Sequence, residues 1–144
     1  MLTRPIKALF CLYLLFAGHS SAQALHVETL QQLAWHYRLL LLNGDALQQD
    51  DLHALSAQSQ ALNERQIMWF WQQQNQIKSN LAHSLSPQST QQISQYLQDV
   101  NVVLIGKDGT IKDKAHAFDL DSLILTIDKM PMRRQEMHNQ TISH

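Results

Sequence analysis

The sequence predicts an α/β fold, a three-layer α/β/α sandwich in the order β-α-β-α-β-β-α with a mixed four-stranded sheet. Three apolar runs of strand length carry this prediction: Leu39–Leu42, Ile67–Trp71 and Val102–Ile105. None of them alternates with polar residues, which is typical of strands buried on both faces. A Lys-Asp-Gly turn follows the third run and predicts a hairpin over Val102–Lys112, because Gly109 can adopt a positive φ.

The start of the chain has the pattern of a secretory signal peptide. Arg4 and Lys7 form a basic start, residues 8–18 are apolar, and Ala22-Gln23-Ala24 matches an Ala-x-Ala cleavage site. The alternative is a membrane anchor, but spanning a bilayer takes about 20 apolar residues and this run is shorter. We therefore expect a signal peptide over residues 1–24 and a periplasmic or secreted location.

The expected mature domain, residues 25–144, contains no cysteine and no transmembrane segment. The one cysteine, Cys11, lies in the apolar leader, so the domain has no disulfide, thiolate nucleophile or cysteine-ligated metal. Without Arg4 and Lys7 the domain carries 9 basic and 12 acidic residues, a formal net charge of −3. It lacks a broad basic surface, which argues against nucleic acid as a partner.

The mature domain begins with a segment that leads into the first strand. Leu25–Tyr37 is interpreted as a short helix or arm, with Thr29 as a possible cap. Asn43-Gly44-Asp45 ends the strand that follows, and Asp45 with Gln48 three residues later resembles a capping box that opens a helix.

This first helix joins two all-apolar strands. Its buried face is predicted to hold Leu52, Leu55 and Leu62, and Asn63-Glu64-Arg65 ends it. A crossover of about 17 residues requires parallel neighbouring strands and a right-handed connection. Trp69 and Trp71 of the second strand are then core residues rather than ligand-stacking groups.

The second half supplies two more helices around the hairpin. Polar residues Gln72–Ser86 predict a loop, after which Ser86 caps a helix that has Pro87 in its first turn. Its apolar stripe is Ile93, Tyr96, Leu97 and Val100. The last helix is expected over Asp119–Met130, and Pro131 either stops it or begins another turn. Its buried face is Leu120, Leu123, Ile124 and Ile127.

This order of elements is that of thioredoxin. Redox proteins of that fold carry cysteines between the first strand and the first helix, where this chain has Asn43–Ala46. They also place a cis-proline just before the third strand, and the equivalent stretch here, Asp99–Val102, has none. Both departures argue against disulfide exchange and peroxidase chemistry, because a fold does not fix its reaction.

Two C-terminal motifs resemble a known family. Val103–Gly109, followed by Ile127–Met137 with its Met-Pro-Met-Arg-Arg-Gln-Glu-Met run, looks like the signature of the bacterial family called domain of unknown function 4174. Trp35 and the run Arg38–Leu41 fit the same pattern. The family is similar to a domain of vertebrate extracellular matrix proteins, among them equarin and the sushi-repeat proteins. The resemblance implies a thioredoxin-like fold and no known activity.

Candidate binding residues lie in the same two motifs: Lys107, Asp108, Arg133, Arg134 and Glu136. The simpler interpretation places Lys107 and Asp108 at a hairpin tip and gives the arginines a role as cations at a helix C-terminus. The methionines around Arg133 and Arg134 favour an adaptable binding surface instead.

Seven histidines are scattered over the mature domain without His-Glu-x-x-His spacing, and the sequence predicts no metal site, cofactor or catalytic residue. We expect an exported, non-catalytic module that binds another exported protein or the cell-envelope surface. The alternative is an enzyme, or a metal or small-molecule binder, that uses Asp45 and a nearby histidine at the first strand–helix junction.

Overall fold

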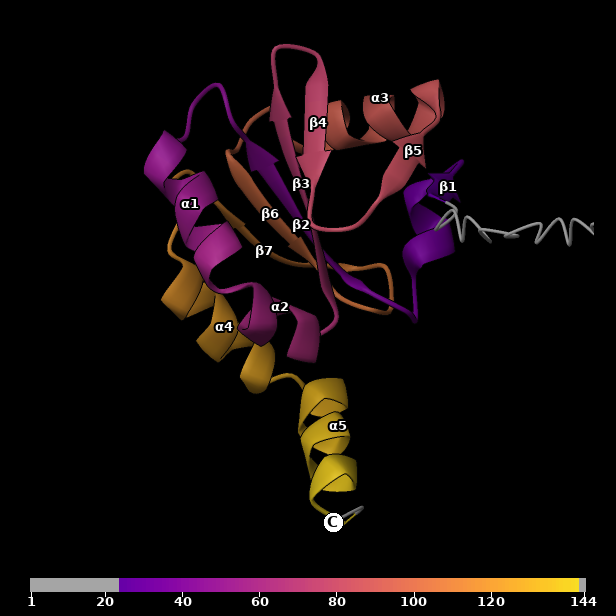
Figure 1. Cartoon of the computed structure of the whole chain (residues 1–144), viewed down its shortest axis with the longest axis vertical. Coiled ribbons are helices and arrows are strands. Elements are labelled where there is room, and N and C mark those ends of the chain that lie inside the picture. Colours follow the sequence, from indigo (N-terminus) through magenta and orange to yellow (C-terminus); the bar gives the residue numbers. More distant parts are fainter. Residues whose placement is uncertain (1–23, 143–144) are drawn as a thin grey trace, which may run out of the picture.

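The computed structural model describes residues 24–142, in which a five-stranded mixed sheet carries helices on both faces (Figure 1). The predicted signal segment up to Gln23 lies outside the described residues. In chain order the elements are β1 (Leu25–Val27), the 3-10 helix η1 (Leu30–Leu33), β2 (Arg38–Asn43), α1 (Gln49–Ala57), α2 (Ser59–Glu64), β3 (Ile67–Gln73), β4 (Gln76–Ser79), β5 (His83–Leu85), α3 (Pro87–Tyr96), β6 (Val102–Ile105), β7 (Ile111–Ala115), α4 (Leu120–Asp128) and α5 (Pro131–Ile142). Within the described range, no helix is both long enough and apolar enough to cross a bilayer.

The sheet has the strand order β4-β3-β2-β6-β7, with β2 at its centre. Strand β2 runs parallel to β3, with Leu40 opposite Trp69, and antiparallel to β6, with Leu40 opposite Leu104. The predicted α/β class, the parallel pair and the hairpin are therefore confirmed. The predicted number of four strands is wrong, because β4 pairs with β3 and makes a fifth strand of the sheet. All three apolar runs are buried, since a central strand of a sheet covered on both faces has no solvent side.

Alternate residues of the strands belong to two separate hydrophobic cores, one on each face of the sheet. On one face Leu40, Leu42, Trp69 and Trp71 pack with the apolar side chains of α1, α2 and α4. On the other face Leu39, Leu41, Met68 and Phe70 pack with α3 and with the segment before β2. The expected placement of both tryptophans in the core is confirmed, because Trp69 and Trp71 are 7% and 1% exposed.

The predicted helix after β2 is two helices, α1 and α2, that meet at Gln58. Near this break the Ser56 hydroxyl donates to the Leu52 carbonyl at 3.1 Å, a side-chain bond that bends helices. The capping box is also displaced from the predicted pair, because Gln48 and Asp51 form it rather than Asp45 and Gln48. An extra turn, with the Leu47 amide bonded to the Asn43 carbonyl, delays the start of the helix.

The segment predicted as a loop contains two strands, β4 and β5. A tight turn with Gln74 and Asn75 both at positive φ joins β3 to β4. Such turns usually show glycine, which this one lacks. The Asn80 side chain then accepts from the Trp69 amide and donates to the Ile67 carbonyl. It thereby bonds the part of β3 that β4 is too short to pair with. Strand β5 pairs with β1 in a separate two-stranded parallel sheet.

The predicted cap of α3 is confirmed, and α4 also has a side-chain cap. Ser86 accepts a hydrogen bond from the Ser89 amide at the start of α3, and Asp119 accepts one from the Ser122 amide at the start of α4. Thr29 holds the N-cap position of η1 without a side-chain bond. Pro131 begins a further helix, α5, which extends from the end of α4 away from the sheet (Figure 1).

The β6–β7 turn is the feature that positions the candidate site. Gly109 has φ +77°, as predicted, and its amide donates to the Gly106 carbonyl. The amide of Trp35 donates to the Lys107 carbonyl from the other side at 2.6 Å. Strand β7 forms the sheet edge, with a register irregularity opposite Leu104 and Ile105 and a largely exposed surface. The turn is thereby fixed against the start of β2.

Candidate functional site

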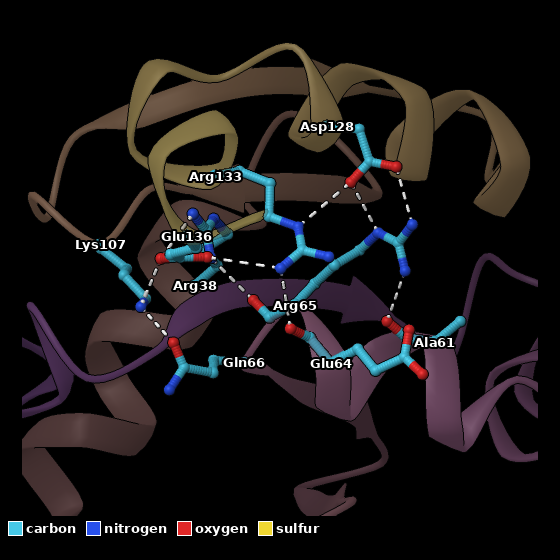
Figure 2. A network of polar contacts seen from close by, with 9 residues as sticks. All are labelled: Arg38, Ala61, Glu64, Arg65, Gln66, Lys107, Asp128, Arg133 and Glu136. Carbon is cyan, nitrogen blue, oxygen red and sulfur yellow. Dashed lines mark hydrogen bonds and ion pairs between the residues drawn. The ribbon is translucent and has the colours of Figure 1, made fainter. Parts of the chain in front are cut away.

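Six charged side chains meet between the sheet and α5 (Figure 2). They come from the start of β2, the end of α2, the β6–β7 turn, the end of α4 and the first turns of α5. We call them the Arg38 cluster: Arg38, Arg65, Lys107, Asp128, Arg133 and Glu136. Arg133 is the buried residue of α5, so charged contacts rather than an apolar face attach that helix.

Arg38 is the most deeply buried member, at 1% exposure. Its Nη1 donates to the Arg65 carbonyl at 2.8 Å. Its two terminal nitrogens also donate to the two carboxylate oxygens of Glu136, each at 3.2 Å. This fork geometry is the strong form of an arginine–carboxylate contact. The first residue of the central strand is thus joined to α5.

Lys107 reaches the same carboxylate from the β6–β7 turn. Its Nζ donates to Glu136 Oε1 at 2.7 Å and to the side-chain oxygen of Gln66. Lys107 is 8% exposed, so it does not sit at the solvent tip of the hairpin, where the simpler interpretation of the sequence placed it. Glu136 therefore bridges two cations that lie far apart in the chain.

A second carboxylate, Asp128, organises the other half of the cluster. Arg65 donates to both of its oxygens, at 2.9 and 2.7 Å, and also to the Ala61 carbonyl. Arg133 approaches the Asp128 carboxylate at 3.4 Å and donates to the Glu64 carbonyl at 3.1 Å. The end of α2 and the start of α5 are joined through these two guanidinium groups.

Both carboxylates are held ionised. Burial alone would raise the pKa of Glu136, but the hydrogen bonds from Lys107 and Arg38 outweigh it and hold that pKa below the ordinary 4.5. The hydrogen bond from Arg65 lowers the pKa of Asp128 below 3.8 against a smaller opposing effect of burial. With both acids ionised, the cluster holds four cations and two anions, an excess of two positive charges.

A cavity of about 240 Å³ opens beside the cluster, between the β6–β7 turn and the start of α5. We call it the hairpin cavity. Its charged lining is Arg38, Lys107, Asp108 and Lys112. The rest of the wall is Gly106, Met130, Pro131 and Met132. Charged and apolar groups around one cavity are the combination found in binding sites for small molecules.

Asp108 and Lys112 form a pair at the rim of this cavity, at 2.7 Å. The hydrogen bond from Lys112, opposed by partial burial and assisted by the bonds from Thr110, lowers the pKa of Asp108 to about 2. The pair is neutral as a unit. It does not offset the excess positive charge of the Arg38 cluster.

The structure brings four of the five candidate residues together. Lys107, Arg133 and Glu136 are members of the Arg38 cluster, and Asp108 lies at the rim of the adjacent cavity. Arg134 is not part of the cluster: it is exposed and forms no ion pair with any other described side chain. Arg133 is 4% exposed and donates to the Glu64 carbonyl at the end of α2, so it is a buried cation at a helix C-terminus rather than a solvent-exposed one.

Sequence reasoning missed Arg38, Arg65, Lys112 and Asp128 as parts of the site. One signal was present: a strand of four leucines that begins with an arginine places a charge where the strand is already covered. Such a charge needs a partner, because an unpaired buried ion is strongly unfavourable. The identity of that partner depends on a contact across 98 residues, between Arg38 and Glu136.

The first strand–helix junction, the alternative site, holds Asp45 in a structural contact. The Asp45 carboxylate accepts from the Gln74 amide at 3.2 Å, and its own amide donates to the Asn43 side chain. No histidine whose side chain the structure describes bonds to it. Among the described side chains, no three His, Cys, Asp or Glu residues are close enough to hold a metal ion.

Acidification is expected to loosen α5. Glu136 and Asp128 have lowered pKa values in the folded chain, so their stabilising contacts are complete above the ordinary pKa values of 4.5 and 3.8. They are lost as the pH falls through the still lower folded values. Hydrogen exchange of α5 amides, corrected for its intrinsic pH dependence, is expected to accelerate between about pH 6 and about pH 3 relative to β2 amides.

The Glu136→Gln variant is the control for this prediction. Its neutral amide keeps the size of the side chain but removes the ion pairs with Arg38 and Lys107. Its α5 is expected to exchange faster already at about pH 6 and to change less on acidification. Equal protection of α5 at both pH values in the unaltered chain would contradict the assignment.

The chain was compared with known proteins. The family model described as Domain of unknown function (DUF4174) matches residues 29–136. This match spans every member of the Arg38 cluster and ends at Glu136. No curated protein and no solved structure matches the chain. Because the family model covers well over half of the sequence, the chain belongs to the DUF4174 family.

Proposed function

We propose that this chain is an exported, non-catalytic binding domain of thioredoxin-like type, whose contact surface is the rim of the hairpin cavity. The basic, apolar and Ala-x-Ala pattern of residues 1–24 supports export to the periplasm or beyond. The order of strands and helices supports the thioredoxin-like assignment. The absence of cysteine from residues 25–144 supports binding rather than thiol chemistry.

The observation that carries the proposal is the hairpin cavity itself. Two segments that are distant in the sequence, the β6–β7 turn and the start of α5, are pinned together by the Arg38 cluster and leave a hollow between them. Met132 is 38% exposed at this rim, and the Lys112 and Asp108 side chains are each 34% exposed. A rigid base with exposed methionine and charged groups is suited to contact another protein or a cell-envelope surface.

The candidate residues divide into two roles in this proposal. Lys107, Arg133 and Glu136 shape the base and hold the turn against α5. Asp108 is exposed at the rim and can contact a partner. Arg134, the residue after Arg133 in α5, is exposed as well. Partner contacts would therefore be made by rim residues, while the buried ones act by positioning them.

The test is capture of proteins from a periplasmic extract by residues 25–144 carrying rim substitutions. Lys112→Glu and Met132→Glu are expected to remove the partners retained by the unaltered domain, because they reverse a charge and place a charge on an apolar contact. Lys114→Glu is the matched control, since Lys114 is an exposed lysine of the same strand outside the cavity lining.

Partner recovery with Lys114→Glu is expected to equal that of the unaltered domain. Circular dichroism of all variants checks that each is folded. The same set of captured proteins with Lys112→Glu as with Lys114→Glu would contradict the proposed contact surface.

A further inference from the structure

We infer that the hairpin cavity binds a small organic anion: an anionic head group, held by Lys107, Lys112 and Arg38, attached to a short apolar body. This inference deepens the proposed function by naming the ligand class of the same cavity. Three independent features of the described residues support it: the charge balance, the start of α5 and the apolar part of the wall.

The charge balance favours an anion. The Arg38 cluster contains four cations and two carboxylates, and no other described carboxylate forms an ion pair with those cations. Arg38 and Lys107 are both more than nine-tenths buried and both line the cavity. Uncompensated charge at such depth is unfavourable, and a bound anion would offset it.

Lys107 and Lys112 have donors to spare. An ammonium group has three donors. Lys107 uses two, on Glu136 and Gln66, and Lys112 uses one, on Asp108. The Asp108 carboxylate also lines the cavity, but its pairing with Lys112 neutralises it. Free donors on two cations facing one cavity are the groups that would bind a carboxylate or a phosphate.

The start of α5 adds to the positive potential. Pro131 and Met132, the first residues of this twelve-residue helix, lie in the cavity wall. The first amides of a helix have no intrahelical acceptor, and the helix dipole favours an anion there. The amides of Met132 and Arg133 find no acceptor among the described residues, whereas that of Arg134 bonds to Met130.

The apolar part of the cavity wall determines which body the anionic head group can carry. Met130, Pro131 and Met132 give the cavity an apolar side, and methionine adapts readily to ligand shape. At about 240 Å³ the cavity is smaller than the roughly 300–1,000 Å³ of sites for drug-sized ligands. The fit is to an anion with a short hydrocarbon body rather than to a bare ion or a large cofactor.

The experiment is an NMR titration of ¹⁵N-labelled residues 25–144 with four probes: hexanoate, hexyl phosphate, hexanamide and inorganic phosphate. Hexanoate or hexyl phosphate is expected to shift the amides of Gly106, Lys107 and Met132 in a saturable manner, and their comparison identifies the head group. Hexanamide, which lacks the charge, is expected to bind about tenfold or more weakly. Inorganic phosphate, which lacks the apolar body, is expected to bind more weakly than hexyl phosphate.

Lys112→Met and Lys114→Met are the matched variants. The first is expected to weaken binding of the better probe about tenfold, and the second is expected to leave it unchanged. The inference is overturned if hexanamide binds as tightly as hexanoate and hexyl phosphate, if inorganic phosphate matches hexyl phosphate, or if the two variants are equal. If partner capture depends on Lys112 but no probe shifts the cavity amides, this inference alone fails. Saturable anion binding with partner capture unaffected by Lys112→Glu contradicts the proposed function alone.

Discussion

Replacing Arg38 with methionine is expected to lower the free energy of unfolding by about 3 kcal/mol or more. The substitution removes both bonds to Glu136 and the bond to the Arg65 carbonyl, from a side chain that is 1% exposed. The Arg65 carbonyl loses its buried donor, and Glu136 keeps only Lys107 at bonding distance. Urea denaturation followed by circular dichroism measures the loss.

Two further variants test the reason for that effect. Arg134→Met, on an exposed arginine of α5, is expected to change stability by no more than about 0.5 kcal/mol. Arg38→Met combined with Glu136→Met is expected to be less destabilising than the sum of the single changes, because the second change removes the carboxylate that the first leaves poorly paired. Strict additivity would show that the two side chains do not act as a pair.

Gly44→Ala is expected to destabilise the fold by about 2–3 kcal/mol through a direct clash. A Cβ at this position would lie 2.1 Å from the Nε1 atom of Trp71 and 2.6 Å from its Cε2 atom. Trp71 is 1% exposed and packed in the core, so it cannot move aside without disturbing its neighbours. A shift in the thermal unfolding midpoint measures the effect.

Gly106→Ala is the comparison, because the atoms nearest to its Cβ would belong to the side chains of Lys112 and Asp108. Both side chains are partly exposed and can shift, so the cost is expected to stay below about 1 kcal/mol. In a Trp71→Phe background the additional cost of Gly44→Ala is expected to fall, since the smaller ring lacks the indole nitrogen. An equal cost in both backgrounds would assign the effect to the backbone instead.

The strands that could be predicted from the sequence are those made of a continuous run of apolar residues. Leu39–Leu42 and Ile67–Trp71 are long enough to specify strands without help from the rest of the chain. Strand β4 was missed because it is half exposed and contains one large apolar residue, Ile77. The three-residue strands β1 and β5 are too short to have a period at all.

The candidate site was predictable only in part, for a different physical reason. Lys107 and Glu136 were identified from their motifs, but their mutual contact depends on how α5 lies against the turn, 29 residues away. Charged residues look alike in a sequence whether they face solvent or one another. Burial of Arg133 could be recognised only once α5 was placed beside α2 and α4.

The free edge of β7 has a consequence for self-association. Lys112, Asp113 and Lys114 lie in sequence along this strand, and its outer side has no partner in the sheet. An antiparallel encounter of two copies centred on Asp113 would set Lys112 of one against Lys114 of the other, and Asp113 against itself. Like charges directly opposite one another oppose strand pairing, so this edge disfavours pairing of two copies in that register.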